Sequence, residues 1–308
     1  MITSIRFSNY RCFKEVEISL GPVTALVGAN GCGKSTVLSA LRVGHTLGAC
    51  DRSAFGGDGC RITFEAGGLL FHRERNANGS YGEGGQWTPR ANALQSVRLD
   101  LGALRHPNQV EHVTRLEQSG ANLTNLFASL SRRQQVAASR RFCDIVPLYS
   151  DVEARPHGSL VPGKHTLLFQ DRWNERAWYT PTDVSDGTLL MFAFLLLPYQ
   201  QDPPELVAIE EPERGLHPFL MGQVVDVLRS LTNPATGAPI QVVLATHSAE
   251  MLDFLRPEEV RFLSRGSDGS VQVEGVATGD PAWEDAFRKY RNSLGDLWLS
   301  GGLGGVPS

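Results

Sequence analysis

The chain has 308 residues, 41% of them hydrophobic, which is enough for a full core in one large domain or in two lobes. Its 29 basic and 33 acidic side chains leave a slightly negative net charge, so the composition shows no global signature of nucleic-acid binding, and only a local basic surface stays open. The five scattered cysteines include no C-x-x-C pair, and no apolar run reaches the length of a bilayer span. We therefore expect a cytoplasmic protein with neither a disulfide framework nor a membrane partner.

The N-terminal segment predicts a β-rich start to the fold. β-Branched and aromatic residues at 2–7, and an alternation of period two at 16–20, indicate two strands joined by a turn at 9–13. The apolar run at 23–27 is typical of a buried strand, and residues 36–47 have the apolar spacing of a helix. The sequence therefore predicts a strand–loop–helix connection here.

The connecting loop, G-A-N-G-C-G-K-S-T at residues 28–36, fits the phosphate-cradling pattern G-x-x-x-x-G-K-[ST]. Its glycines let backbone N–H groups converge on phosphate oxygens, at a helix N-terminus that favours anions. Lys34 would add positive charge near the β- and γ-phosphates, and Ser35 a hydroxyl ligand for Mg²⁺. The residues expected to contact the nucleotide here are Asn30, Gly31, Cys32, Gly33, Lys34, Ser35 and Thr36.

The middle of the chain changes in composition. Glycine-rich residues 51–89 predict an antiparallel meander with a long, mobile loop and a strand at 61–65, and residues 97–101 indicate a further strand. Apolar residues spaced three and four apart predict a helix over 122–146. That helix carries Arg132, Arg133, Arg140 and Arg141. These arginines form either a solvated helix face or a basic surface for DNA phosphates.

The C-terminal half alternates strands with helices, after a hairpin that is expected at 167–179. Strands are expected at 206–209, 240–244, 260–263 and 270–276, and helices at 187–197, 220–231 and 282–290. This alternation implies a parallel sheet with right-handed crossovers. The glycine-rich end at 301–308 is expected to be flexible.

Two carboxylates follow the apolar strand at 206–209. At the carboxyl edge of a parallel sheet, Glu210 and Glu211 would face the nucleotide. Since successive strand residues point in different directions, we assign Glu210 to the metal shell, through water, and Glu211 to the attacking water as base. The alternative is a charged strand end in solvent, which the structured loop at 212–218 disfavours.

Two further positions complete the candidate site. His247 ends the next buried strand, where it would hydrogen-bond the γ-phosphate or the attacking water. Such a histidine is more often a core residue when it occurs alone, but beside the loop and the carboxylates a sensing role is favoured. Ser185 and Gly187 open an apolar helix and form a second anion site, although a simple N-cap by Ser185 or Asp186 explains the same residues.

In this order, the motifs resemble the ATP-binding-cassette (ABC) ATPase superfamily, in its soluble branch of SMC/RecF-like and overcoming-lysogenization-defect-like (OLD-like) ATPases. Residues 5–13 resemble the first strand of that branch, 28–35 its Walker A motif, 184–187 its signature motif, 209–213 with 215–218 its Walker B motif and D-loop, and 246–248 its switch histidine. The resemblance covers most of the chain. It adds Arg11, in the opening segment, to the expected nucleotide contacts.

The resemblance implies an α/β fold, a P-loop NTPase head with a central, mainly parallel sheet. An N-terminal antiparallel β subdomain and a helical lobe that carries the signature motif would complete it, without coiled-coil arms. Residues 1–308 would form a single head, with a nucleotide-binding lobe at 1–100 and 200–300 and a helical lobe at 101–199. ATP and Mg²⁺ are the implied cofactors. Glu211, His247 and Lys34 would act in catalysis, with Ser35 and Glu210 holding the metal.

The chain departs from the family pattern at two places. Glu210 stands where the family usually has Asp, which lengthens the metal arm by one methylene, and the signature is abbreviated, with Asp186 and Thr188 at positions usually small or polar. The glutamine of the family's Q-loop has no diagnostic flank here. Three residues lie in the right interval: Gln95, Gln109 and Gln118.

By the same resemblance, two heads would dimerise head to tail, each ATP lying between Walker A of one subunit and Ser185 and Gly187 of the other. ATP would close the dimer and hydrolysis would open it. The favoured interpretation is an ATPase that acts in DNA repair or phage defence, on DNA or on a separate effector such as a nuclease or toxin. The alternative is a nucleotide-gated scaffold with little turnover, and a transporter ATPase subunit is disfavoured.

Overall fold

The computed structural model describes residues 1–45, 59–90, 93–156, 163–234, 238–276 and 279–301. The chain divides into two compact units, which are described separately. The first unit comprises Met1–Ser96, Glu205–Glu213 and Gln241–Ser308, and the second comprises Val97–Pro204 and Arg214–Ile240. From the sequence, residues 200–300 are expected to belong to the nucleotide-binding lobe. In the structure, the segment Arg214–Ile240 belongs to the second unit.

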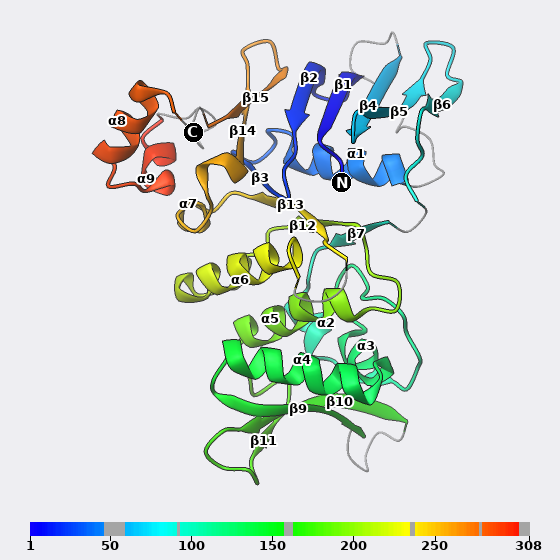
Figure 1. The fold of residues 1–308 in the computed structure, drawn as a ribbon, viewed down its shortest axis with the longest axis vertical. Helices are drawn as coiled ribbons and strands as arrows, with labels where there is room; N and C mark the ends of the chain where they lie inside the picture. Colours follow the sequence, from blue (N-terminus) through cyan, green and yellow to red (C-terminus); the bar gives the residue numbers. More distant parts are fainter. Residues whose placement is uncertain (46–58, 91–92, 157–162, 235–237, 277–278, 302–308) are drawn as a thin grey trace. The chain divides into compact units, whose positions relative to one another are not determined.

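A six-stranded sheet forms the centre of the first unit (Figure 1), in the order β15-β14-β3-β13-β12-β7. Its strands are β3 (Val23–Val27), β7 (Leu94–Val97), β12 (Leu206–Glu210), β13 (Gln241–Thr246), β14 (Val260–Arg265) and β15 (Val271–Gly275). β12, β13, β3 and β14 run parallel, and β15 is antiparallel to β14. The middle strands are apolar and almost fully buried, as expected where both faces are covered. The predicted mainly parallel sheet is thereby confirmed.

A second sheet of the first unit is antiparallel, in the order β2-β1-β4-β5-β6. Its strands are β1 (Ser4–Tyr10), β2 (Phe13–Ser19), β4 (Cys60–Ala66), β5 (Leu69–Arg75) and β6 (Tyr81–Gly85). This confirms the predicted N-terminal β subdomain. Tyr10 pairs with Phe13, so the turn between β1 and β2 is shorter than expected. Part of the long loop expected at 51–89 falls outside the described residues, and β6 occupies another part of it.

Helix α1 (Lys34–His45) is the next element after β3 and packs between the two sheets, against β12 and β13 and against β4 and β5 (Figure 1). It begins two residues earlier than predicted, and residues 46–47 of the prediction lie outside the described residues. Three short helices close the C-terminal part: α7 (Ala249–Leu252), α8 (Pro281–Lys289) and α9 (Leu294–Leu299). The pattern predicted α8 but not α9, which buries Trp298. Of the predicted flexible end, only Gly301 is described.

The second unit combines helices with a small antiparallel sheet around β10. Its elements are α2 (Leu101–Arg105), β8 (Asn108–Gln109), α3 (Leu123–Ser129), α4 (Arg132–Ile145), β9 (Tyr149–Pro156), β10 (Lys164–Asp171), β11 (Trp178–Tyr179), α5 (Asp186–Leu196) and α6 (Pro218–Leu231). The rings of Phe142, Phe169 and Phe192 meet edge-on or tilted in its core. β10 pairs with β11, which confirms the predicted hairpin.

Two secondary-structure predictions in this unit are wrong, both because of helix caps. The strand expected at 97–101 is absent because Asp100 caps α2, its carboxylate accepting a hydrogen bond from Ala103 N at 2.8 Å. The helix expected over 122–146 is two helices. Ser131 caps the N-terminus of α4 in a capping box with Gln134, so α4 starts as a separate helix after α3.

The longest helices of the described residues, α4 and α6, have 14 residues each, too few for coiled-coil arms. In the part of the chain that the structure describes, no helix combines the length and the apolarity that crossing a bilayer requires.

Candidate nucleotide site

The phosphate loop leaves β3 and enters α1, and two of its glycines, Gly28 and Gly33, lie so close to neighbouring residues that a larger side chain would displace them. A Cβ atom at Gly28 would lie 2.3 Å from the carbonyl oxygen of Leu263, and one at Gly33, where φ is +106°, 3.1 Å from the ring of Phe13. Thr36 N and Val37 N both donate to Gly33 O, so the first turn of α1 starts within the loop. The loop is therefore held at a helix N-terminus, the arrangement that binds phosphate.

The close approach at Gly28 gives a test of the loop's packing. We expect Gly28→Ala to destabilise the protein by about 2–4 kcal/mol, since the backbone of Leu263 must move to admit a methyl group. Gly31→Ala is the matched control. Nothing lies within 4 Å of a Cβ at Gly31, so the change should cost only about 1 kcal/mol for the positive φ of +79°. Denaturant unfolding measures both, and equal losses would contradict the packing argument.

Lys34 lies over the loop that precedes it. Its Nζ donates to Gly28 O at 2.6 Å and to Ala29 O at 2.9 Å, and lies 3.8 Å from Cys32 Sγ. Burial raises the pKa of the Cys32 thiol, against the opposing effect of the Lys34 ammonium. The ammonium thus lies against carbonyl oxygens of the loop, while Ser35 is exposed at the first turn of α1.

The turn between β1 and β2 touches the start of α1. Cys12 Sγ lies 3.9 Å from Thr36 Oγ1, and Cys12 O accepts a hydrogen bond from Val271 N. The half-buried Arg11 belongs to this turn, and its guanidinium lies 5.5 Å from the ring centroid of Tyr10. The turn that carries Arg11 therefore lies beside the start of α1, although two strands, β2 and β3, separate them in the sequence.

The two carboxylates and the histidine lie at the sheet edge that carries the phosphate loop. In the parallel register Glu210 pairs with Ala245, and Thr246 pairs with Val27, the residue before the loop. His247 Nδ1 lies 3.3 Å from Glu211 Oε1, and both side chains are partly open to solvent. Glu211 has a φ of +47°, which is uncommon for a non-glycine residue, and its N–H donates to Ala245 O at 2.9 Å. A carboxylate and an imidazole are thus paired beside the loop.

Glu213 is a functional candidate that the sequence indicated only as part of a motif. Its side chain is buried, and its Oε1 accepts a hydrogen bond from Thr246 Oγ1 at 2.6 Å. Burial raises the pKa of this carboxyl group, and the hydrogen bond from Thr246 opposes the rise.

In the second unit, Ser185 caps α5. The residue is exposed, and its Oγ accepts a hydrogen bond from Thr188 N at 3.2 Å and lies 2.8 Å from Thr188 Oγ1, so the simple N-cap role is present. Gly187 is buried, and a Cβ there would lie 2.2 Å from Leu220 Cδ1. The packing of α5 against α6 is thus a sufficient reason for this glycine.

Sequence reasoning missed Arg105, at the end of α2. Its guanidinium donates to the carbonyl oxygens of Pro181 and Val184, the latter at 3.2 Å, and pairs with the carboxylate of Asp186. One side chain therefore holds the turn that carries Ser185. The aspartate at an unusual signature position was the only sequence signal for this contact.

The three candidate glutamines of the Q-loop lie in different places. Gln95 is buried on β7, the strand beside β12 in the central sheet, and Gln109 is exposed on β8. Gln118 lines a cavity of the second unit together with Arg98 and Arg214.

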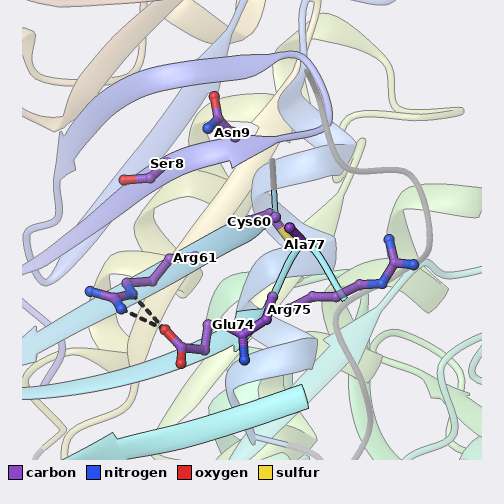
Figure 2. Close-up of a pocket in the computed structure, with 9 residues that line it drawn as sticks. Ser8, Asn9, Cys60, Arg61, Glu74, Arg75 and Ala77 are labelled. Atoms are coloured by element: carbon purple, nitrogen blue, oxygen red, sulfur yellow. Dashed lines mark hydrogen bonds and ion pairs between the residues drawn. The ribbon is translucent and has the colours of Figure 1, made fainter. Parts of the chain in front are cut away.

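A polar pocket in the antiparallel sheet is a separate feature (Figure 2). Its walls are Ser8, Asn9, Gly59, Cys60, Arg61, Glu74, Arg75, Asn76 and Ala77, none of them from the phosphate loop. Arg61 forms an ion pair with Glu74 at 2.6 Å, which Figure 2 shows across the pocket wall. One of the two arginines in its wall is thus already paired with a carboxylate.

The residues at the sheet edge fit Mg²⁺ bound together with a nucleotide. The described residues hold no cluster of three or more His, Cys, Asp or Glu side chains that would bind a metal by themselves. Mg²⁺ needs no such cluster, since it keeps several waters and takes one or two protein oxygens besides phosphate. The exposed Ser35 hydroxyl and the Glu210 carboxylate at the end of β12 have the right chemistry for those oxygens.

A phosphate loop between a buried parallel strand and a helix, with paired carboxylates at the same sheet edge, defines a P-loop ATPase head. The family model described as "AAA domain, putative AbiEii toxin, Type IV TA system" matches residues 92–253, more than half of the 308 residues, and the "AAA ATPase domain" model matches residues 1–43. This chain belongs to that family of AAA ATPases.

Solved structures show the same fold. An SMC head bound to the C-winged helix domain of ScpA is similar with a TM-score of 0.63 at 14% identity, over 91% of this chain and 99% of that one. The SMC head domain from Thermotoga maritima has a TM-score of 0.59 at 14% identity, over 90% and 99%. A curated relative, the OLD nuclease of Thermus scotoductus, is 44% identical over 41 residues, which are 13% of this chain and only 8% of that protein.

Proposed function

We propose that this protein binds ATP with Mg²⁺ at the phosphate loop and hydrolyses it. The observation that carries the proposal is the Glu211–His247 pair, at 3.3 Å, on the sheet edge from which the phosphate loop leaves β3. Membership of an ATPase family supports it, as does the glycine cradle around Lys34.

Each residue of the pair has a distinct role in the proposed reaction. Glu211 accepts the proton of the attacking water. His247, whose Nδ1 lies 3.3 Å from Glu211 Oε1, keeps the carboxylate oriented and presents Nε2 to the phosphate side. Lys34 adds positive charge at the cradle. Held by Ser35 and Glu210, Mg²⁺ would neutralise charge on the β- and γ-phosphates.

We further propose that the site is completed by a second copy of the chain. The N-terminus of α5 is open to solvent at Ser185, and the turn before it is organised by Arg105. The phosphate loop already places its nucleotide at the N-terminus of α1. The N-terminus of α5 therefore has no nucleotide to bind within the same polypeptide. In a head-to-tail dimer, the N-terminus of α5 would face the nucleotide of the other copy, in agreement with the ABC-type resemblance.

The closing dimer would act on DNA or on a separate effector. Arg132, Arg133 and Arg140 are exposed on α4, and no described acidic side chain forms an ion pair with them. These free cations favour DNA phosphates. A relative named as a nuclease, a family description that names a toxin, and a similar SMC head bound to another protein favour an effector.

An ATPase assay with and without double-stranded DNA separates these functions. Stimulation by DNA that disappears in Arg133→Ala/Arg140→Ala, with the basal rate retained, supports action on DNA. Turnover that ignores DNA supports a protein partner. Tight ATP binding without turnover supports the second candidate, a nucleotide-gated scaffold, which the longer Glu210 in place of the usual Asp favours.

A further inference from the structure

A buried acid lies behind the candidate catalytic pair and is used by none of the steps above. Glu213 is 7% exposed, and Thr246, its hydrogen-bond donor, is fully buried. No described residue donates a hydrogen bond to Glu213 Oε2. Burying a carboxyl group is unfavourable unless it is hydrogen-bonded. The 2.6 Å hydrogen bond from Thr246 offsets part of this cost for Glu213.

The Thr246 hydroxyl both donates and accepts a hydrogen bond. Its single proton goes to Glu213 Oε1, so a lone pair is left to accept the N–H of Ser248 at 3.0 Å. The hydroxyl therefore fixes the backbone on both sides of His247, the residue between them. Without Glu213 the hydroxyl could rotate, and its bond to Ser248 would no longer be enforced.

The segment that carries Glu211 is fixed to the same strand. Glu211 N donates to Ala245 O, two residues before His247, and Glu213 reaches Thr246, one residue before it. The end of β13 is thus held by the chain that follows β12 at two successive residues. The 3.3 Å contact between His247 Nδ1 and Glu211 Oε1 lies immediately beyond these two attachments.

From this geometry we infer that Glu213 is a positioning residue for hydrolysis: through Thr246 it holds His247 in hydrogen-bonding distance of Glu211. The inference rests on the proposed ATPase function and assigns a task to the second glutamate of the E-P-E sequence at 211–213. Glu213 itself touches neither water nor phosphate in this scheme.

Two matched pairs of variants test it. Thr246→Val removes the hydroxyl at nearly constant shape, and Thr246→Ser keeps it; Glu213→Met removes the acceptor, and Glu213→Gln keeps Oε1. We expect Thr246→Val and Glu213→Met to lower kcat about 10- to 100-fold, with the Kd for a fluorescent ATP analogue within about twofold of wild type. Thr246→Ser and Glu213→Gln should recover most of the turnover. A purely structural role would instead weaken nucleotide binding and turnover together.

A second readout does not depend on turnover. In protein labelled with ¹⁵N-histidine, the His247 ring signals are assigned with His247→Gln. They should report the contact of Nδ1 with Glu211 in wild type and Thr246→Ser, and its loss in Thr246→Val. Unchanged His247 signals in Thr246→Val, or equal loss of kcat in both Thr246 variants, would overturn the inference. Wild-type protein without ATP turnover would refute the proposed function, while the ring signals would still decide the role of Glu213.

Discussion

Glu211→Gln is expected to abolish ATP turnover and to trap an ATP-bound dimer. The amide has the shape of the carboxylate but cannot accept the proton of the attacking water, so kcat should fall about 10²- to 10⁴-fold. Nucleotide affinity should persist, because the phosphate loop and Lys34 are unchanged. Phosphate release measures turnover, and size-exclusion chromatography with and without ATP measures the dimer.

Glu274→Gln provides the control for this change. Glu274 is an exposed carboxylate on β15, in the same unit but outside the candidate site, so the variant should retain wild-type turnover. Retention of turnover by Glu211→Gln would refute the assignment of Glu211 as the base. A variant that loses turnover but stays monomeric with ATP would contradict the head-to-tail dimer instead.

Ser185→Arg is expected to abolish hydrolysis and leave ATP binding by the monomer intact. Ser185 is exposed at the N-terminus of α5, and the proposed dimer uses it on the nucleotide of the neighbouring copy. A bulky cation at this position should block closure of the dimer. Loss of the serine N-cap should also lower the stability of the protein by about 1 kcal/mol. Fluorescence titration with an ATP analogue measures binding, and phosphate release measures turnover.

Mixing this variant with Lys34→Ala makes the test specific for action between subunits. Each variant alone should be inactive. A mixed dimer contains one site with an intact Walker A motif and an intact signature motif, so a 1:1 mixture should recover about a quarter of wild-type turnover. No recovery on mixing, or loss of ATP binding by the Ser185→Arg monomer, would contradict the assignment of Ser185 to the partner's site.

Much of the fold was predictable because its signals are local. β3, β12 and β13 are continuous apolar runs, and these are typical of parallel strands covered on both faces. The phosphate loop combines glycines, a lysine and a serine at fixed spacing between a strand and a helix, so its structure follows from neighbouring residues. The β10–β11 hairpin likewise joins segments that are close in the chain.

The errors of prediction have equally local causes. Asp100 and Ser131 each redirect the chain by capping a helix, and periodicity alone does not register a cap. The serine and the glutamine of the Ser131–Gln134 capping box could be recognised in the sequence. The hydrophobic spacing on either side of them nevertheless favoured one continuous helix.

The residues taken in order were sufficient for the class of protein and for the candidate loop, carboxylates and histidine. They did not show that Glu211 lies against His247, that the buried Glu213 holds Thr246, or that Arg105 organises the turn of Ser185. Each of these contacts joins segments far apart in the chain, 33 residues for Glu213 and Thr246 and 79 for Arg105 and Val184. Spacing patterns report neighbours within one element. Contacts between strand ends depend on parallel register and crossover connections, which exist only in the folded sheet.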